Sequence, residues 1–410
     1  MSLPTTLLLA LAPQTVHDLA GQWRGTLECP GGELPFGLSI EEPRPGELVG
    51  WLINGPERRR VPRLEVVEPG GIVPQYRLHL DPYDSRLEFV HVGGELRGEW
   101  VRYRDESRET RLPFRATAGA DAPRFALGEV DPRAANALAG RWRVDFSSSE
   151  DDAVGLLEVQ DGGAVVGTFL TTLGDYRWLA GATDGRSLRL SVFDGAHAFL
   201  FAATVQADGS LAGDFWSRDS WHETWTAVKD PRAALPDPFG LTTWTGALPL
   251  GELAFPDLDG KRRALDEEAF AGKVRLLVLF GSWCPNCYDE TRYLVELHRR
   301  YAERGLSILG LAFEFGDDLP RQRRVLKRFV EHLGVEYPIL IAGTNDKAKA
   351  SQAFPLLDRV RSYPTTVFLD GTGEVLAVHT GFSGPATGEA HQRLRERFEA
   401  LIDDALTGER

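Results

Sequence analysis

Two cysteines separated by two residues are the feature of this sequence best suited to chemistry. They lie in the segment Cys284-Pro285-Asn286-Cys287. Such a pair can reduce or form disulfides, because one thiolate attacks a sulfur and the second thiol resolves the mixed disulfide. It can also supply half of a zinc site, which needs four ligands. The third cysteine, Cys29, stands alone and is expected to be a small buried apolar residue. Redox chemistry is therefore the favoured interpretation.

The residues around the pair predict that it lies where a strand turns into a helix. Residues 273–280 are apolar and rich in β-formers, which predicts a buried strand, and residues 284–305 have helical spacing and end at a glycine. A helix N-terminus presents unpaired N–H groups and the positive end of the helix dipole, and both stabilise a thiolate. We therefore expect Cys284 to be the more exposed and more readily ionised nucleophile, with Cys287 as the resolving thiol.

Two neighbours of the cysteines have expected roles, and the elements that follow complete a domain. Pro285 suits the first helical turn because it lacks an N–H group, and Trp283 is expected to cover one side of the pair. Further strands are predicted at 306–313, 337–341, 365–370 and 374–379, and further helices at 321–333 and 389–406. This order predicts a mixed sheet with helices on both faces.

The preceding part of the chain contains an internal repeat. The residues LAGQWR at 19–24 return as LAGRWR at 138–143, and residues 94–100 resemble residues 209–215. Between these anchors, short alternating runs are separated by turn signals such as Asp-Gly pairs. Each copy predicts a small antiparallel barrel or sandwich of roughly six to eight strands. Residues 58–60, three arginines beside a proline, are interpreted as a solvated turn.

The chain is thus predicted to be multi-domain, as its length of 410 residues also indicates. Two tandem small antiparallel β-barrel or sandwich repeats are followed by an α/β domain. The predicted boundaries are 1–16 for an N-terminal tail or signal remnant, 17–118 for the first repeat, 119–135 for a linker, 136–230 for the second repeat, 231–246 for a second linker and 247–410 for the α/β domain.

Charge and hydropathy exclude some partners. The 46 Lys and Arg residues against 60 Asp and Glu give a formal charge of −14, which disfavours nucleic acid and anionic membrane surfaces. No apolar run is long enough for an integral membrane segment.

Residues 7–12 could be a short signal-peptide apolar region, although no Lys or Arg precedes them. Export signal and plain tail both remain open.

Four segments carry a family resemblance. The residues FGSWCPNCYDE at 280–290, FPDLDGK at 255–261, FAGKV at 270–274 and YPTTVFLD at 363–370 resemble the TlpA/ResA-like branch of the thioredoxin superfamily. The resemblance covers residues 246–410 and implies a thioredoxin fold and a thiol-disulfide oxidoreductase. Because such relatives act mostly outside the cytoplasm as disulfide reductases, it implies a reductase in the periplasm or another extracytoplasmic compartment, with a cytoplasmic location as the alternative.

The resemblance also implies roles for particular residues. It implies a redox-active Cys284–Cys287 disulfide and no other cofactor. Pro364 is expected to follow a cis peptide bond and to lie against the cysteines, and Tyr363 to offer its backbone to a substrate chain. Trp283 and Pro285 complete the expected substrate contacts. Glu290 is expected to lie by the pair and modulate its acidity, since Val278 stands where thioredoxins carry a buried Asp.

The expected partners are disulfide-containing client proteins and an upstream thiol electron donor. Two other functions remain open. Thiol peroxidases of the peroxiredoxin type place Thr three residues before the peroxidatic cysteine, where this chain has Gly281. Alternatively, the β repeats bind a partner or ligand through aromatic residues such as Trp216, Trp221 and Trp225, although aromatics at these spacings more often pack in a core.

Overall fold

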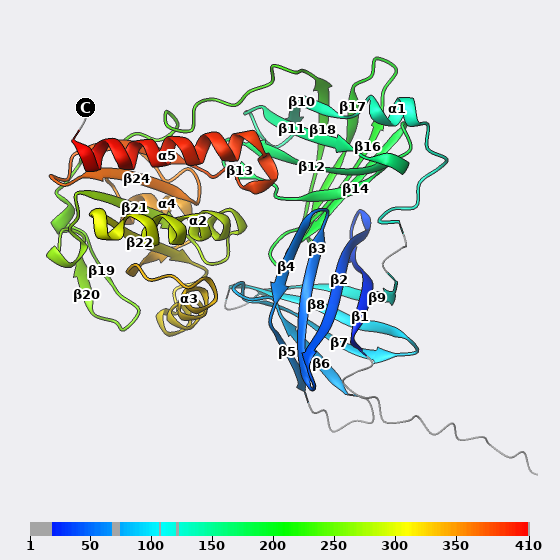
Figure 1. Cartoon of the computed structure of the whole chain (residues 1–410), viewed down its shortest axis with the longest axis horizontal. Coiled ribbons are helices and arrows are strands. Elements are labelled where there is room, and N and C mark those ends of the chain that lie inside the picture. Colours follow the sequence, from blue (N-terminus) through cyan, green and yellow to red (C-terminus); the bar gives the residue numbers. More distant parts are fainter. Residues whose placement is uncertain (1–18, 68–73, 106–107, 120–122, 409–410) are drawn as a thin grey trace, which may run out of the picture.

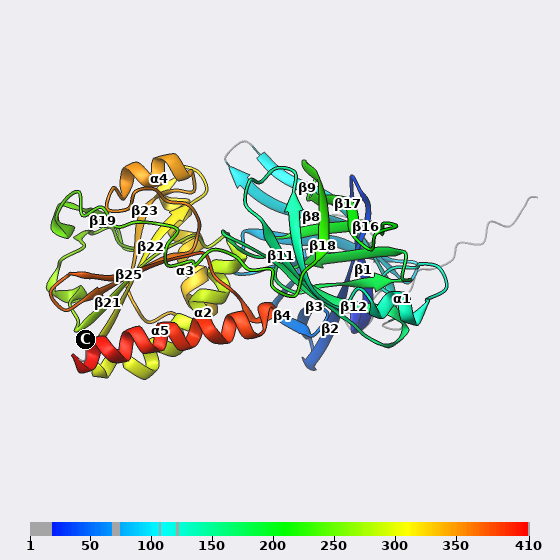
Figure 2. The ribbon, with the colours of Figure 1, turned by 90° about the horizontal axis from the view of Figure 1, so that it is seen from above.

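The structure, a computed structural model, describes residues 19–67, 74–105, 108–119 and 123–408. The predicted tail or signal remnant at 1–16 lies outside the described residues. Figures 1 and 2 show two β-sheets on one side of the molecule and an α/β domain on the other. Each β-sheet has nine strands, and the α/β domain is built on a five-stranded sheet. No helix of the described residues is both long and apolar enough to cross a membrane.

The first sheet is antiparallel and follows the alternating pattern of its sequence. In β9, for example, Thr110, Leu112, Phe114 and Ala116 are buried and the residues between them are more exposed, because successive side chains of a strand point to opposite faces. The strand order is β4-β3-β2-β1-β9-β8-β7-β6-β5. The strands are β1 (Gly21–Cys29), β2 (Gly32–Arg44), β3 (Glu47–Asn54), β4 (Glu57–Val61), β5 (Arg63–Val67), β6 (Gln75–His79), β7 (Ser85–Val92), β8 (Glu95–Asp105) and β9 (Arg108–Ala118).

The second sheet is also antiparallel and closes into a barrel, because β11 pairs with both β10 and β12. Aromatic side chains fill its interior; Phe201 and Phe215, for instance, stack with ring centroids 4.3 Å apart. Its strands are β10 (Gly140–Phe146), β11 (Ala153–Val159), β12 (Ala164–Thr171), β13 (Gly174–Asp175), β14 (Leu179–Thr183), β15 (Ser187–Phe193), β16 (Ala198–Val205), β17 (Leu211–Ser217) and β18 (Trp221–Lys229).

In the described residues each β-sheet has nine strands, more than the six to eight strands predicted for each repeat. The difference arises because short polar strands are hard to recognise from sequence. The clearest case is β4, where the three arginines interpreted as a solvated turn instead pair with β3. Arg59 is 5% exposed, donates to the carbonyl of Asp81 and lies over the ring of Tyr83. The solvated-turn prediction was therefore wrong, since backbone pairing and a buried partner outweighed the polarity of the side chains.

The two sheets pack closely against each other. The Ser191 hydroxyl in β15 donates to the carbonyl of Pro35 in β2 over 2.7 Å, and the Asn54 amide donates to the carbonyl of Phe193 over 2.9 Å. The rings of Phe36 and Phe193 lie 4.6 Å apart between the sheets. Part of the first sheet's apolar core is therefore completed by residues of the second.

The C-terminal domain has the predicted mixed sheet, in the order β23-β22-β21-β24-β25. Strands β21, β22 and β23 are parallel, and β24 and β25 run antiparallel to their neighbours. All seven residues of β21 are buried, as expected of a central strand covered on both faces. These strands are β21 (Val274–Phe280), β22 (Leu306–Glu314), β23 (Ile339–Thr344), β24 (Thr365–Asp370) and β25 (Val375–Thr380), and a separate two-stranded sheet consists of β19 (Ala254–Pro256) and β20 (Arg262–Ala264).

The helices cover both faces of this sheet, with α2 and α5 on one side and α4 on the other (Figure 2). A Tyr293 hydroxyl on α2 donates to the Arg395 carbonyl on α5 over 3.2 Å. The helix predicted for 284–305 is α2 followed by a short 3₁₀ turn, and it ends at Gly305 with φ +111°. The prediction missed α4. The helices are α1 (Pro132–Asn136), α2 (Pro285–Tyr301), α3 (Leu319–Leu333), α4 (Lys347–Ala353) and α5 (Glu389–Thr407).

The second linker is docked on the C-terminal domain from Asp237 to Trp244. Trp244 forms a β-bridge with Leu357, and Asp237 accepts from the Arg397 guanidinium over 3.0 Å. The same guanidinium lies 3.7 Å above the ring of Phe239. These contacts fix the path of the chain between the second sheet and the C-terminal domain.

Candidate active site

The two cysteines lie at the end of β21 and the start of α2, as the sequence predicts. Cys284 is the N-cap residue of α2, and its Sγ accepts a hydrogen bond from the Cys287 N–H over 3.3 Å. Pro285 occupies the first helical turn. Both cysteines are free thiols. This N-cap contact is one of the interactions that stabilise negative charge on a sulfur atom.

The two thiols have different environments. Cys284 is 7% exposed and Cys287 is fully buried. Burial, followed by the hydrogen bond to Cys284 and its charge, raises the pKa of Cys287 well above its ordinary value. Cys284 is therefore the more accessible of the two thiols, and burial favours the neutral form of Cys287.

Trp283 and its neighbour anchor the loop before the cysteines. The Trp283 indole donates to the Phe313 carbonyl over 2.8 Å, and its ring lies 5.7 Å from that of Tyr363. The Ser282 N–H and hydroxyl each donate to a different oxygen of Glu314 over 2.7 Å. Burial raises the pKa of Glu314 to about 7. The loop is thus tied to the end of β22 by three hydrogen bonds.

The predicted cis peptide bond is present between Tyr363 and Pro364. The Cys284 thiol donates to the Tyr363 carbonyl over 3.4 Å, so this loop lies directly against Cys284. Thr365 is fully buried and its hydroxyl donates to the Ser362 carbonyl over 2.9 Å. The structure therefore brings Trp283 and Cys284 together with Tyr363 and Pro364, a pair of residues far away in the sequence.

Glu290 is buried rather than surface-exposed. Its side chain is 1% exposed, and one carboxyl oxygen accepts from the Thr366 hydroxyl over 2.7 Å. The other oxygen has no hydrogen-bond partner among the described residues. Burial raises the pKa of Glu290 to about 8, and its charge contributes to the raised pKa of Cys287. The carboxyl is thus placed to exchange a proton near neutral pH.

A buried charge cluster at the start of α2 has no counterpart in the sequence analysis. Arg177, 2% exposed and from the second sheet, contacts Glu57 of the first sheet and Asp194 of its own sheet, the latter at 3.7 Å. It also lies 3.3 Å from Asp289, two residues after Cys287. Burial raises the pKa of Asp289 to about 7 against the opposing effect of Arg177. No local pattern signals this cluster, because its members come from all three parts of the fold.

The other sequence candidates have structural positions. Trp225 is in the barrel core, Trp216 packs on Gly31 of the first sheet, and Trp221 is 47% exposed. Cys29 is buried as predicted, and burial raises its pKa to about 12. These residues lie in the β-sheets, and none of them lines the cysteine pair.

Comparison with known proteins matches the C-terminal domain. Residues 246–392 match the Redoxin family model. The thiol-disulfide oxidoreductase ResA of Halalkalibacterium halodurans is 27% identical over 151 residues, 36% of this chain and 73% of that protein. ResA of Bacillus thuringiensis subsp. konkukian is 30% identical over 120 residues, 29% of this chain and 61% of that protein.

A solved structure is similar to part of this chain. The thioredoxin-family thiol:disulfide interchange protein of Chlorobium tepidum TLS shares 23% identity, covers 38% of this chain and 92% of its own, and has a TM-score of 0.29. The Redoxin match and the ResA relatives coincide with the domain that holds the cysteine pair. The C-terminal domain of this chain is therefore similar to the TlpA/ResA-like thiol-disulfide oxidoreductases of the thioredoxin superfamily.

Proposed function

We propose that this chain is a protein disulfide reductase in which Cys284 attacks a client disulfide and Cys287 completes the exchange. The Cys284 thiolate forms a bond with one client sulfur, the client disulfide breaks, and the other client sulfur leaves as a thiolate. Cys287, after losing its proton, attacks the Cys284 sulfur and releases the second client sulfur. The client gains two electrons and two protons, and an upstream dithiol donor must reduce the resulting Cys284–Cys287 disulfide.

The N-cap position of Cys284 is the observation that carries this proposal. The Cys287 N–H points at the Cys284 sulfur, and the start of α2 adds its dipole. An N–H group and the positive end of a helix dipole both suit a negatively charged sulfur, and the thiolate is the reactive form of a cysteine. Cys287 is fully buried, so a client cannot reach it directly. This burial supports its assignment as the resolving thiol, which attacks the Cys284 sulfur after the mixed disulfide has formed.

Glu290 is proposed to accept the proton that Cys287 must lose before it attacks. A carboxyl with a pKa of about 8 is close to the working range of such a base. Trp283, Pro285, Tyr363 and Pro364 are proposed to border the bound client. Their placement around the nucleophile supports this role.

A trapping experiment tests the mechanism. In the presence of insulin and a dithiol reductant, the unmodified chain is expected to reduce insulin, and Cys284→Ser to be inactive. With oxidised insulin and no added reductant, Cys287→Ser is expected to form a mixed disulfide that a non-reducing gel resolves and that later addition of dithiothreitol removes. Adduct formation through Cys287 in the Cys284→Ser variant, at the same rate, would contradict the assigned order of attack.

The peroxidase alternative has no support from the site. A Cβ atom at Gly281 would lie 2.2 Å from the Trp283 indole nitrogen and 2.9 Å from the Phe313 carbonyl oxygen. A threonine at this position would therefore collide with the anchored tryptophan.

The reductase direction and an extracytoplasmic location, with a cytoplasmic one as alternative, rest on the family resemblance. Fractionation of the producing cells with a periplasmic marker tests the location.

The two β-sheets are proposed to be copies of one repeat. Supporting this, the Trp23 indole donates to the Leu19 carbonyl over 3.0 Å, and the Trp142 indole donates to the Leu138 carbonyl over 2.9 Å. The same hydrogen bond thus begins both sheets. A partner-binding role for these sheets without redox chemistry would be favoured if a Cys284→Ser/Cys287→Ser variant kept full biological activity.

A further inference from the structure

A loop of the second sheet reaches across to the cysteine pair. This segment, Thr171–Asp175, is called the 171–175 loop; it comprises the last residue of β12, a two-residue turn and the short strand β13. The Leu173 carbonyl accepts from the Ser362 hydroxyl over 2.6 Å, directly before the cis-proline turn. The Asp175 carboxylate accepts from the Gly384 N–H over 2.5 Å. The loop is therefore held by two of the loops that surround the cysteines.

The loop also touches Asn286, one of the two residues between the cysteines. A Cβ atom at Gly174 would lie 1.9 Å from the Asn286 amide nitrogen, and Gly174 has φ +143°. The positive φ favours glycine at this position, and the Asn286 side chain lies close against it. The 171–175 loop thus contacts the cysteine loop, the cis-proline loop and the loop after β25.

The opposite side of the cysteine loop is covered by the first sheet. The Arg102 guanidinium donates to the Trp283 carbonyl over 3.0 Å and to the Ala196 carbonyl of the second sheet. Cys284, between these two coverings, is 7% exposed. Little of the Cys284 side chain is therefore left open to a client, and both β-sheets contact the loop that carries it.

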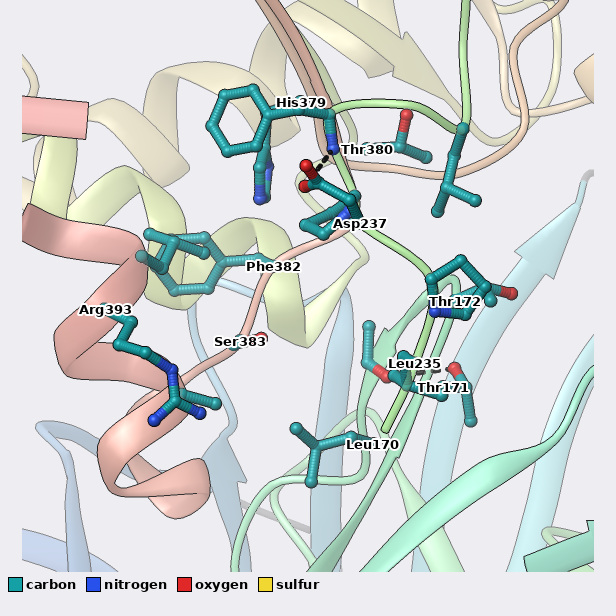
Figure 3. A pocket seen from close by; sticks show the side chains of 18 of the residues that line it. Leu170, Thr171, Thr172, Leu235, Asp237, His379, Thr380, Phe382, Ser383 and Arg393 are labelled. Carbon is teal, nitrogen blue, oxygen red and sulfur yellow. Dashed lines mark hydrogen bonds between the residues drawn. The ribbon is translucent and has the colours of Figure 1, made fainter. Parts of the chain in front are cut away.

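Hollows flank the 171–175 loop on both sides. A cavity of about 690 Å³ separates Leu170, Thr171 and Thr172 from Phe382 and Ser383 (Figure 3). A second cavity of about 360 Å³ lies in the mouth of the barrel and is lined by the whole loop together with Asn286. The Leu173 side chain is 46% exposed. The tip of the loop is thus anchored by its backbone but is not enclosed by packed side chains.

We propose that the 171–175 loop is a specificity determinant that admits small disulfides and thin, flexible segments to Cys284 and restricts disulfides in bulky proteins. This inference rests on the proposed reductase function and identifies its substrate class. The chemistry is unchanged: the client takes two electrons and two protons from the dithiol, and a dithiol reductant restores the pair. The loop acts on access, because its bulk borders the path to the sulfur.

Two loop variants with opposite effects test the proposal. In Thr172→Gly/Leu173→Gly the tip loses its bulk, and in Leu173→Trp it gains bulk. Each is assayed with oxidised glutathione and with insulin as substrates and dithiothreitol as electron donor. The glycine variant is expected to raise kcat/KM for insulin by about tenfold, and the tryptophan variant is expected to lower it. In both variants kcat/KM for oxidised glutathione is expected to change by less than about twofold. Val228→Ala, at an apolar position of the same sheet that is 48% exposed, is the matched control and should leave both substrates unchanged.

The outcomes distinguish a failure of this specificity proposal from a failure of the proposed reductase function. If the unmodified chain reduces neither substrate, the reductase function fails. If it reduces oxidised glutathione and the ratio of the two kcat/KM values is the same in all variants, the loop is not a specificity determinant. An equal loss with both substrates in the two loop variants, with unfolding temperatures unchanged, overturns the proposal as well.

Discussion

Replacing Glu290 with glutamine should remove a pH-dependent loss of stability. Burial raises the pKa of this carboxyl from 4.5 to about 8. The fold therefore favours the protonated form, and stability falls as pH rises from the ordinary pKa towards the folded-state pKa. One pKa unit corresponds to about 1.4 kcal/mol. Integrating the titration from pH 5 to pH 7 gives a loss of about 2.5 kcal/mol that Glu290→Gln, which keeps the acceptor for Thr366, does not suffer.

Urea denaturation at pH 5, 6 and 7 under reducing conditions measures this effect. The unfolding free energy of the wild type relative to Glu290→Gln should fall by about 2.5 kcal/mol across the range. Glu296→Gln, on the exposed side of the same helix, is the control and should run parallel to wild type. If the wild-type and Glu290→Gln curves are also parallel, Glu290 does not titrate in this range, and its proposed role as proton acceptor is refuted.

Three further substitutions have defined consequences. Arg177→Met leaves the buried carboxylate of Asp194 with one fewer cationic neighbour, and should lower the unfolding free energy by about 3–5 kcal/mol; an unchanged melting temperature would show that the cluster is not stabilising. Gly281→Thr should displace the Trp283 side chain and lower the rate at which insulin is reduced, without creating hydrogen-peroxide consumption. A gain of peroxidase activity in this variant would contradict this reasoning. Asp318→Ala removes the cap that accepts from the Arg321 N–H and should cost about 1 kcal/mol in unfolding free energy, with no effect expected on the redox potential.

Local patterns were sufficient to predict much of the fold. The strands predicted at residues 273–280 and 365–370 coincide with β21 and β24 to within one residue, because both runs are rich in apolar and β-branched residues. The cysteine pair was also placed correctly, since a buried strand followed by helical spacing and a terminal glycine has few other interpretations.

The parts that could not be predicted depend on contacts between distant segments. Arg59 became a buried strand residue because Asp81 and Tyr83 supply partners that its own neighbours do not. Arg177 meets Asp289 only when all three parts of the fold assemble. The burial of Glu290 and the approach of the 171–175 loop likewise require the assembled structure, and no spacing in the chain encodes them.

The redox potential of the Cys284–Cys287 couple tests the central claim most directly. It is measured by equilibrating the chain with dithiothreitol or glutathione mixtures and counting free thiols with an alkylating label. A reductase should have a potential near that of thioredoxin, about −270 mV, and should reduce insulin. A potential near about −120 mV with no insulin reduction, as in strong thiol oxidants, would contradict the proposed direction of electron flow.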